Sequence, residues 1–123
     1  VGVHQVLADS DVLAVPSKDT RTGSEQWGRV VVEAMSTGRS VLVSSAGELP
    51  HLVDDPDCVF RPGDPGSLAL ALDALLADSS LVAARAEAAH RRAGAFRPDI
   101  LANQLVAFWD QVLARWQLRN GMQ

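Results

Sequence analysis

Two glutamates separated by seven residues frame the stretch of this sequence best suited to chemistry. Glu25 precedes a predicted helix start at Gly28, and Glu33 lies five residues inside that helix, about 7.5 Å along its axis. Free backbone N–H groups and the helix dipole make such a start an anion site, and Gly28 permits close approach because it has no Cβ. Ionised carboxylates only accept hydrogen bonds, so they suit hydroxyl-rich groups such as sugar and ribose. The two carboxylates could therefore bracket a ligand that also touches the helix start.

The same residues also allow a purely structural interpretation. Arg29 and Glu33 are four residues apart, so they could form a solvated ion pair worth about 0.3 kcal/mol. Glu25 would then be an ordinary loop residue, and Gly28 a turn residue. Spacing alone leaves both interpretations open.

The elements that must position these residues alternate between strands and helices. Apolar runs predict a strand at 11–15, buried on both faces, a second buried strand at 40–45 and a shorter one at 58–61. Helical patterns occupy residues 3–8, 28–37, a short stretch ending at 53, a segment from 65, residues 79–93 and a segment from 98. This order predicts an α/β fold with a parallel sheet and right-handed crossovers. Ligands of such sheets bind beyond the carboxyl ends of the strands, where the polar loop 17–27 begins.

Composition excludes several classes of function. Apolar residues make up 47% and charged residues 21% of 123, which is typical of one globular domain. The net charge of −4 argues against a nucleic-acid partner. Apolar runs such as 68–72 are far shorter than the ~20 residues of a membrane span, and we expect no signal peptide because the sequence opens without a basic stretch followed by an apolar one. The single cysteine, Cys58, is expected to be a small buried hydrophobic residue in a reducing compartment, so we expect a cytoplasmic location.

The stretch around the two glutamates resembles a known family. Glu25-x(7)-Glu33, followed by Ala34-Met35, Gly38 and the strand at Val41, is similar to the Glu-x(7)-Glu signature of retaining glycosyltransferases of family 4, which have the GT-B fold. Three further segments are similar to consecutive segments of that family, namely LADSDVLAVPS (7–17), SVLVSSAGELPHLV (40–53) and FRPGDPGSLALAL (60–72). The resemblance therefore covers almost the whole chain. Ser40 stands where the family usually has Pro, and Gly47-Glu48-Leu49-Pro50-His51 replaces a common Gly-Gly-x-Pro-Glu. Because of these departures the resemblance does not identify a subfamily.

The resemblance implies a fold and a division of the chain. The fold class is α/β, the second half of a Rossmann-like doubly wound parallel sheet, with three short parallel strands, flanking helices and a helical tail. Residues 1–97 would form the partial nucleotide-sugar-binding domain of the C-terminal half of a GT-B enzyme. Residues 98–123 would form an amphipathic helix whose apolar stripe either packs across the neighbouring domain, as in the family, or closes the local core.

The resemblance also implies residue roles. The residues that correspond to the family's donor-sugar contacts are Glu25, Gln26, Trp27 and Gly28. Arg29 and Val30 correspond to its diphosphate contacts, and Glu33 corresponds to its ribose contact. No residue of this sequence is assigned as catalytic, and neither a metal nor another cofactor is expected. The donor substrate would be a nucleoside diphosphate sugar.

The implied function is the donor-binding part of a retaining glycosyltransferase that acts on an unknown acceptor. The family takes a basic pair from the upstream half of this domain and acceptor contacts from a separate N-terminal domain. Those segments are missing from this sequence, so the chain alone is expected to be inactive. Peripheral membrane association through the missing part stays open. The alternative is a truncated, catalytically silent domain that binds a nucleotide or only packs against a partner.

Overall fold

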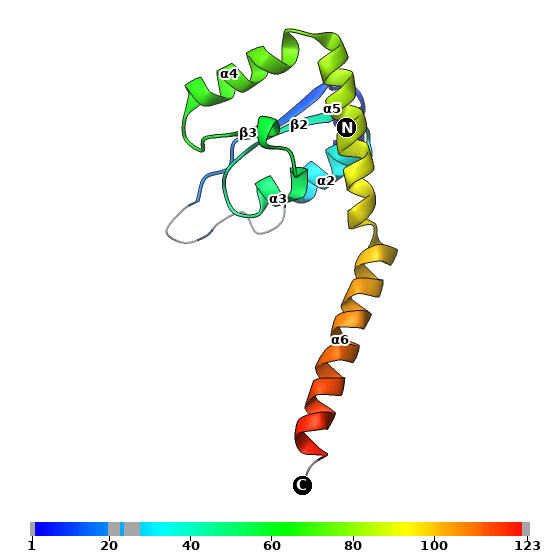
Figure 1. Ribbon diagram of the computed structural model, residues 1–123. Coiled ribbons are helices and arrows are strands. Elements are labelled where there is room, and N and C mark those ends of the chain that lie inside the picture. Colours follow the sequence, from blue (N-terminus) through cyan, green and yellow to red (C-terminus); the bar gives the residue numbers. More distant parts are fainter. Residues whose placement is uncertain (1, 20–22, 24–27, 122–123) are drawn as a thin grey trace.

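Three short parallel strands organise the fold in a computed structural model that describes residues 2–19, 23 and 28–121. The sheet has the order β1 (Val12–Val15), β2 (Ser40–Ser44), β3 (Val59–Phe60). Val12 pairs with Ser40, and Val43 pairs with both Val15 and Val59. The predicted α/β class with a parallel sheet is confirmed (Figure 1).

Helices connect and cover these strands. They are α1 (Val3–Ala8), α2 (Arg29–Ser36), α3 (Leu49–Val53), α4 (Pro65–Leu76), α5 (Ser79–Ala93) and α6 (Pro98–Asn120), with 3-10 turns η1 (Pro56–Cys58) and η2 (Gly94–Phe96). Local chemistry sets several starts. Asp64 and Asp78 cap α4 and α5 by accepting hydrogen bonds from the Ser67 and Ser80 N–H groups.

The core lies around β2. Every residue of β2 is buried, and α2, α3 and α5 all contact this strand. Met35, Leu42, Leu49, Val31, Val41 and Val43 are the largest fully buried apolar side chains. The predicted burial of the 11–15 strand on both faces is wrong, because all four residues of β1 are only half-buried. In the described part of the chain β1 has a single neighbouring strand, so it is an edge strand, whereas β2 has a neighbour on each side.

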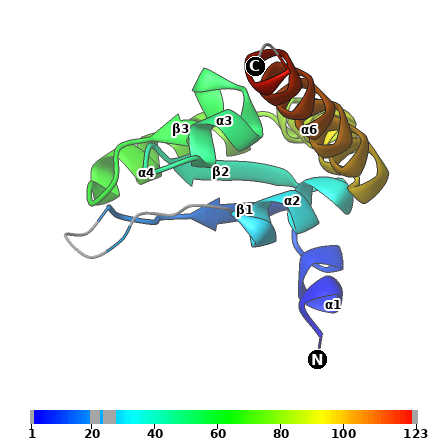
Figure 2. The same ribbon diagram turned by 90° about the horizontal axis from the view of Figure 1, so that it is seen from below.

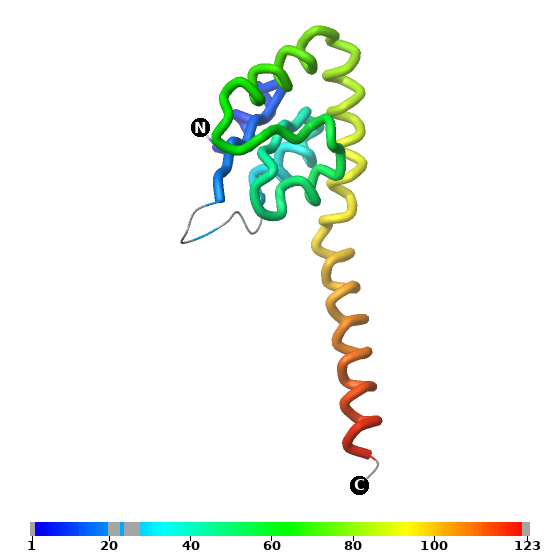
Figure 3. The backbone as a smooth tube through the Cα atoms, turned by 60° about the vertical axis from the view of Figure 1, so that its left-hand side comes forward, coloured from blue at the N-terminus to red at the C-terminus, as the bar shows by residue number. Residues whose placement is uncertain are grey.

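The C-terminal helix α6 projects away from this body (Figures 1 and 3). Figure 2 shows the same arrangement from below, with α6 foreshortened. Its contacts with other elements are made mainly with η2, which directly precedes it. Large apolar side chains stay exposed along it, namely Ile100, Leu101, Leu105, Val106, Phe108, Trp109, Leu113, Trp116 and Leu118. The apolar stripe therefore does not close the local core.

No described helix is by itself long and apolar enough to cross a membrane. The segments Pro65–Leu76 and Ser79–Phe96, bent by 103° at their junction, meet that length and composition only when taken together.

Candidate functional site

The carboxyl ends of the three strands meet at one edge of the sheet because the strands are parallel. They end at Val15, Ser44 and Phe60. The chain between β1 and β2 leaves this edge after Val15 and comes back as α2, whose N-cap residue is Gly28. The start of α2 is therefore the described part of the site predicted from the glutamates (Figure 1).

The start of α2 has two backbone N–H donors that meet no acceptor among the described residues. The Gly28 carbonyl accepts hydrogen bonds from the N–H groups of Val31, at 2.9 Å, and Val32, at 3.2 Å. The described residues supply no acceptor for the N–H groups of Arg29 and Val30. Two donors at the positive end of a helix dipole favour an anion.

Glu33 forms the ion pair of the structural interpretation. Arg29 Nε lies 3.4 Å from Glu33 Oε1, and the side chains are 85% and 30% exposed respectively. A pair with one partner almost entirely in solvent contributes about 0.3–0.5 kcal/mol. Such a weak pair leaves the Glu33 carboxylate available to hydroxyl groups of a ligand, so the ion pair and a binding role are compatible.

Gly28 packs closely against neighbouring buried side chains. A Cβ at this position would lie 2.5 Å from Leu49 Cδ2, 3.0 Å from Leu52 Cδ1 and 3.2 Å from Val31 Cγ2. Leu49 and Leu52 are buried residues of α3. The missing Cβ thus lets the start of α2 pack directly against α3, a contact that the sequence reasoning did not anticipate.

Glu25, Gln26 and Trp27 lie outside the described residues. The structure therefore does not relate Glu25 to Glu33, and the donor-sugar roles of these three residues stay predictions. Gly28, Arg29, Val30 and Glu33 are described, and they share the first two turns of α2.

Lys18 is a cation at this edge that is not among the site residues predicted from the sequence. It is the only lysine of the chain and follows β1 by three residues, which is the signal that could have singled it out. Its Cε lies 3.5 Å from the Cβ position of Gly63, in the turn after β3. A cavity of about 170 Å³ lies there, lined by Pro16, Lys18, Phe60, Gly63, Asp64, Pro65 and Leu68. The loops that follow β1 and β3 therefore meet across the end of β2.

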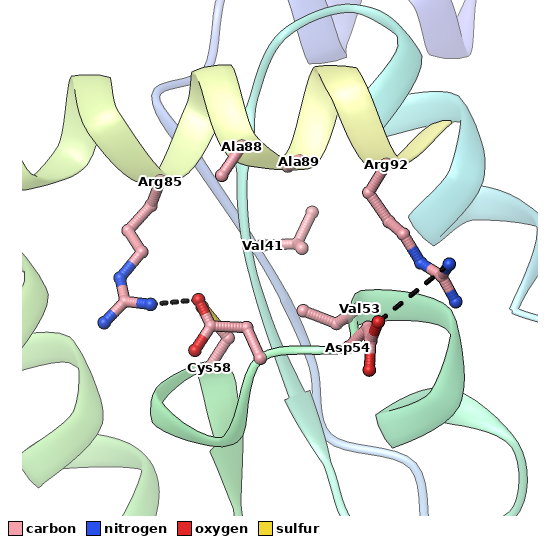
Figure 4. Close-up of a pocket in the computed structure, with 9 residues that line it drawn as sticks. Val41, Val53, Asp54, Cys58, Arg85, Ala88, Ala89 and Arg92 are labelled. Atoms are coloured by element: carbon pink, nitrogen blue, oxygen red, sulfur yellow. Dashed lines mark hydrogen bonds and ion pairs between the residues drawn. The ribbon is translucent and has the colours of Figure 1, made fainter. Parts of the chain in front are cut away.

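A second cavity, of about 140 Å³, lies between α5 and the segment that leads into β3 (Figure 4). Arg85 crosses it to pair with Asp55 and, at 2.7 Å, with Asp57. Arg92 donates to the backbone carbonyls of His51 and Leu52. These guanidinium donors are engaged by protein groups, so the two arginines clamp α5 to the segment 51–57.

Cys58 lies in the same cavity and is buried, as predicted. Burial, reinforced by the Asp55 carboxylate, raises the pKa of its thiol to about 11. A thiol that holds its proton so firmly is a poor nucleophile.

No group of three His, Cys, Asp or Glu side chains within residues 2–19, 23 and 28–121 has the arrangement of a metal site. The expectation of a reaction without metal stays a prediction.

Comparison with known sequences relates this chain to enzymes that transfer sugars. Residues 1–78 match the family described as "Glycosyl transferases group 1". The sulfoquinovosyl transferase SQD2 of Arabidopsis thaliana is 35% identical over 81 residues, which cover 62% of this chain and 15% of that protein. The D-inositol 3-phosphate glycosyltransferase of Mycolicibacterium vanbaalenii is 32% identical over 118 residues, which cover 94% of this chain and 25% of that protein. The chain thus spans a quarter or less of the length of these relatives.

Solved structures give the same relation. Sucrose-phosphate synthase from Thermosynechococcus elongatus aligns with a TM-score of 0.74 and 27% identity, covering 89% of this chain and 27% of that one. HepE from Anabaena, in complex with UDP, aligns with a TM-score of 0.70 and 30% identity, covering 88% of this chain and 29% of that one. Both neighbours are GT-B glycosyltransferases, so the predicted fold class is confirmed.

Proposed function

The chain belongs to the glycosyl transferases group 1 family, and from that premise we propose that it forms the donor-binding part of a retaining, family 4 glycosyltransferase. The donor is a nucleoside diphosphate sugar, and the acceptor is recognised by parts of the enzyme other than this chain. The proposed location is cytoplasmic.

The start of α2 at the carboxyl edge of the sheet carries this proposal. The N–H groups of Arg29 and Val30, which have no acceptor within the described part of the chain, suit the diphosphate, because both lie at the positive end of a helix dipole. Glu33, one turn further along, suits the ribose hydroxyls. The donor sugar is assigned by resemblance to Glu25, Gln26, Trp27 and Gly28, which precede that turn.

In the proposed reaction the bond from the anomeric carbon to the diphosphate oxygen breaks. An acceptor oxygen bonds to the same carbon on the same face, the diphosphate leaves with the electron pair, and the acceptor proton passes to an oxygen of the leaving diphosphate. Negative charge grows on the diphosphate as this bond breaks, so preorganised N–H donors stabilise the transition state more than the ground state. Glu25 would hold the sugar hydroxyls and would not act as a nucleophile.

The UDP bound to HepE supports a nucleotide ligand, because that structure aligns with 88% of this chain. The alternative function is a catalytically silent nucleotide-binding or packing domain. It is favoured by one specific observation, the exposed apolar side chains along α6.

The test separates the roles of the two glutamates. Calorimetry compares UDP, GDP and ADP with their glucose conjugates, using the wild-type chain, Glu33→Ala and Glu25→Ala. Loss of charged hydrogen bonds costs about 1.5–3 kcal/mol at the affected contact. Glu33→Ala should weaken the binding of the bare nucleoside diphosphate and of its sugar conjugate alike, because ribose is present in both. Glu25→Ala should weaken the binding of the sugar conjugate only.

Glu87→Ala is the matched control. Like Glu33, Glu87 pairs with an arginine four residues away, Arg91, but it lies on α5. Its replacement should leave every affinity unchanged. The role assignment is wrong if Glu25→Ala weakens the bare diphosphate as much as Glu33→Ala does. Binding of no nucleotide by the wild-type chain would favour the packing function.

A further inference from the structure

The hydroxyl of Ser44 ties the chain after β1 to the end of β2. We propose that Ser44 is a positioning residue for donor binding, because its Oγ donates a hydrogen bond to the Ser17 carbonyl where the chain leaves the sheet toward α2. The role rests on the function proposed for the carboxyl edge. Ser44 would act through the backbone and would not touch the donor.

This hydrogen bond holds the chain after β1 against β2 beyond the last paired residues of the two strands. The register of β1 and β2 ends with Val15 opposite Val43. Beyond that point the bond from Ser44 Oγ to the Ser17 oxygen, at 2.6 Å, is the described hydrogen bond between residues 16–19 and β2. Ser44 is completely buried, so water does not compete for its hydroxyl.

The segment after β2 holds the other end of the same connection. Gly28 packs against Leu49 and Leu52 of α3, close enough that a Cβ would overlap Leu49. Both ends of the connection between β1 and α2 are thus fixed by one continuous segment, residues 44–52. Their relative position is set by β2 and α3 together.

The same hydrogen bond also places Lys18. This residue follows Ser17 directly, and its side chain lies close to Gly63 and lines the cavity of about 170 Å³. Release of the Ser17 carbonyl would therefore move both the start of the connection and the lysine at that edge.

Ser40 provides a control within the same strand. It is completely buried like Ser44, and its Oγ donates to a backbone carbonyl, that of Val82 on α5, at 2.7 Å. The two serines make equivalent bonds at opposite ends of β2. Only the bond of Ser44 reaches the connection that leads to the proposed donor site.

The experiment compares Ser44→Ala, Ser44→Thr and Ser40→Ala in the complete chain. Urea unfolding gives their stability, and calorimetry with UDP, GDP and ADP and their glucose conjugates gives donor affinity. Amide chemical shifts report on residues 17–19 and 28–30. Both alanine variants should lose stability. Ser44→Ala should weaken binding of the best donor about tenfold and shift the amide signal of Lys18, whereas Ser40→Ala should change affinity less than twofold. Ser44→Thr, which keeps the hydroxyl, should restore affinity.

Three outcomes would overturn the positioning role. They are unchanged affinity in Ser44→Ala, equal losses of affinity in the two alanine variants, and no recovery in Ser44→Thr. Ser44→Cys replaces Ser44→Ala if the alanine variant does not fold, because it keeps a side chain of similar size with a weaker donor. Failure of the wild-type chain to bind any nucleotide would instead overturn the proposed function, and the positioning role with it.

Discussion

The close packing of Gly28 makes a quantitative prediction. A Cβ at position 28 would lie 2.5 Å from Leu49 Cδ2 and 3.0 Å from Leu52 Cδ1, so Gly28→Ala overpacks a buried contact. Overpacking costs about 1–3 kcal/mol. The backbone of Gly28, with φ of −72°, suits alanine, so reduced unfolded-state entropy returns about 0.4–1 kcal/mol. We expect a net loss of about 1–2 kcal/mol in the free energy of unfolding.

A double-mutant cycle in urea, followed by circular dichroism, tests this prediction. Leu49→Ala alone should cost about 2–5 kcal/mol, because Leu49 is completely buried. In the Leu49→Ala background Gly28→Ala should cost almost nothing, which gives a coupling energy of about 1–2 kcal/mol. Gly94→Ala is the control, since its Cβ meets no atom within 4 Å and its φ is −57°. It should stabilise slightly. An equal cost of Gly28→Ala in both backgrounds would refute the packing argument.

Three further outcomes follow from the structure. Burial raises the pKa of the Cys58 thiol from 9.0 to about 11, so the unfolded chain loses this proton at lower pH than the folded chain. The free energy of unfolding should therefore fall by about 2 kcal/mol between pH 9 and pH 11, and urea titrations should show a smaller fall in Cys58→Ala. Arg85→Met leaves the Asp55 carboxylate without its partner and should lower the free energy of unfolding by about 1.5–3 kcal/mol, and an unchanged urea midpoint would show that the clamp does not stabilise the fold. Replacing the exposed Leu105 and Trp109 of α6 by glutamine should reduce hydrophobic-dye fluorescence and self-association in sedimentation without lowering stability, and self-association of equal strength in the variant would place its cause elsewhere.

Much of the fold follows from local sequence signals. Asp64-Pro65 and Pro98 place the starts of α4 and α6 where the structure has them, because capping and a fixed φ depend only on neighbouring residues. The burial of β2 follows in the same way from its apolar run. The burial of β1 does not, because it depends on how many strands flank it, and the apolar pattern does not contain that information.

In the site, too, local features could be predicted from the sequence, whereas contacts between distant residues could not. The sequence placed Gly28, Arg29, Val30 and Glu33 at a helix start, and the structure describes them there. The tie at Ser44 was missed, because a serine at the end of a buried strand carries no distinctive pattern and its partner Ser17 is 27 residues away. The contact of Gly28 with α3 was missed for the same reason. Both contacts depend on which elements the fold brings together.

The central claim is that the start of α2 binds the diphosphate of a nucleotide. Titration of the isotope-labelled chain with UDP, GDP and ADP, followed by amide chemical shifts, tests it most directly. The best of these ligands should shift the amide signals of Arg29 and Val30 most, and Glu33→Ala should abolish the change at matched concentration. Shifts concentrated around Cys58 and Arg85, or none with any of the three nucleotides, would contradict diphosphate binding at the start of α2.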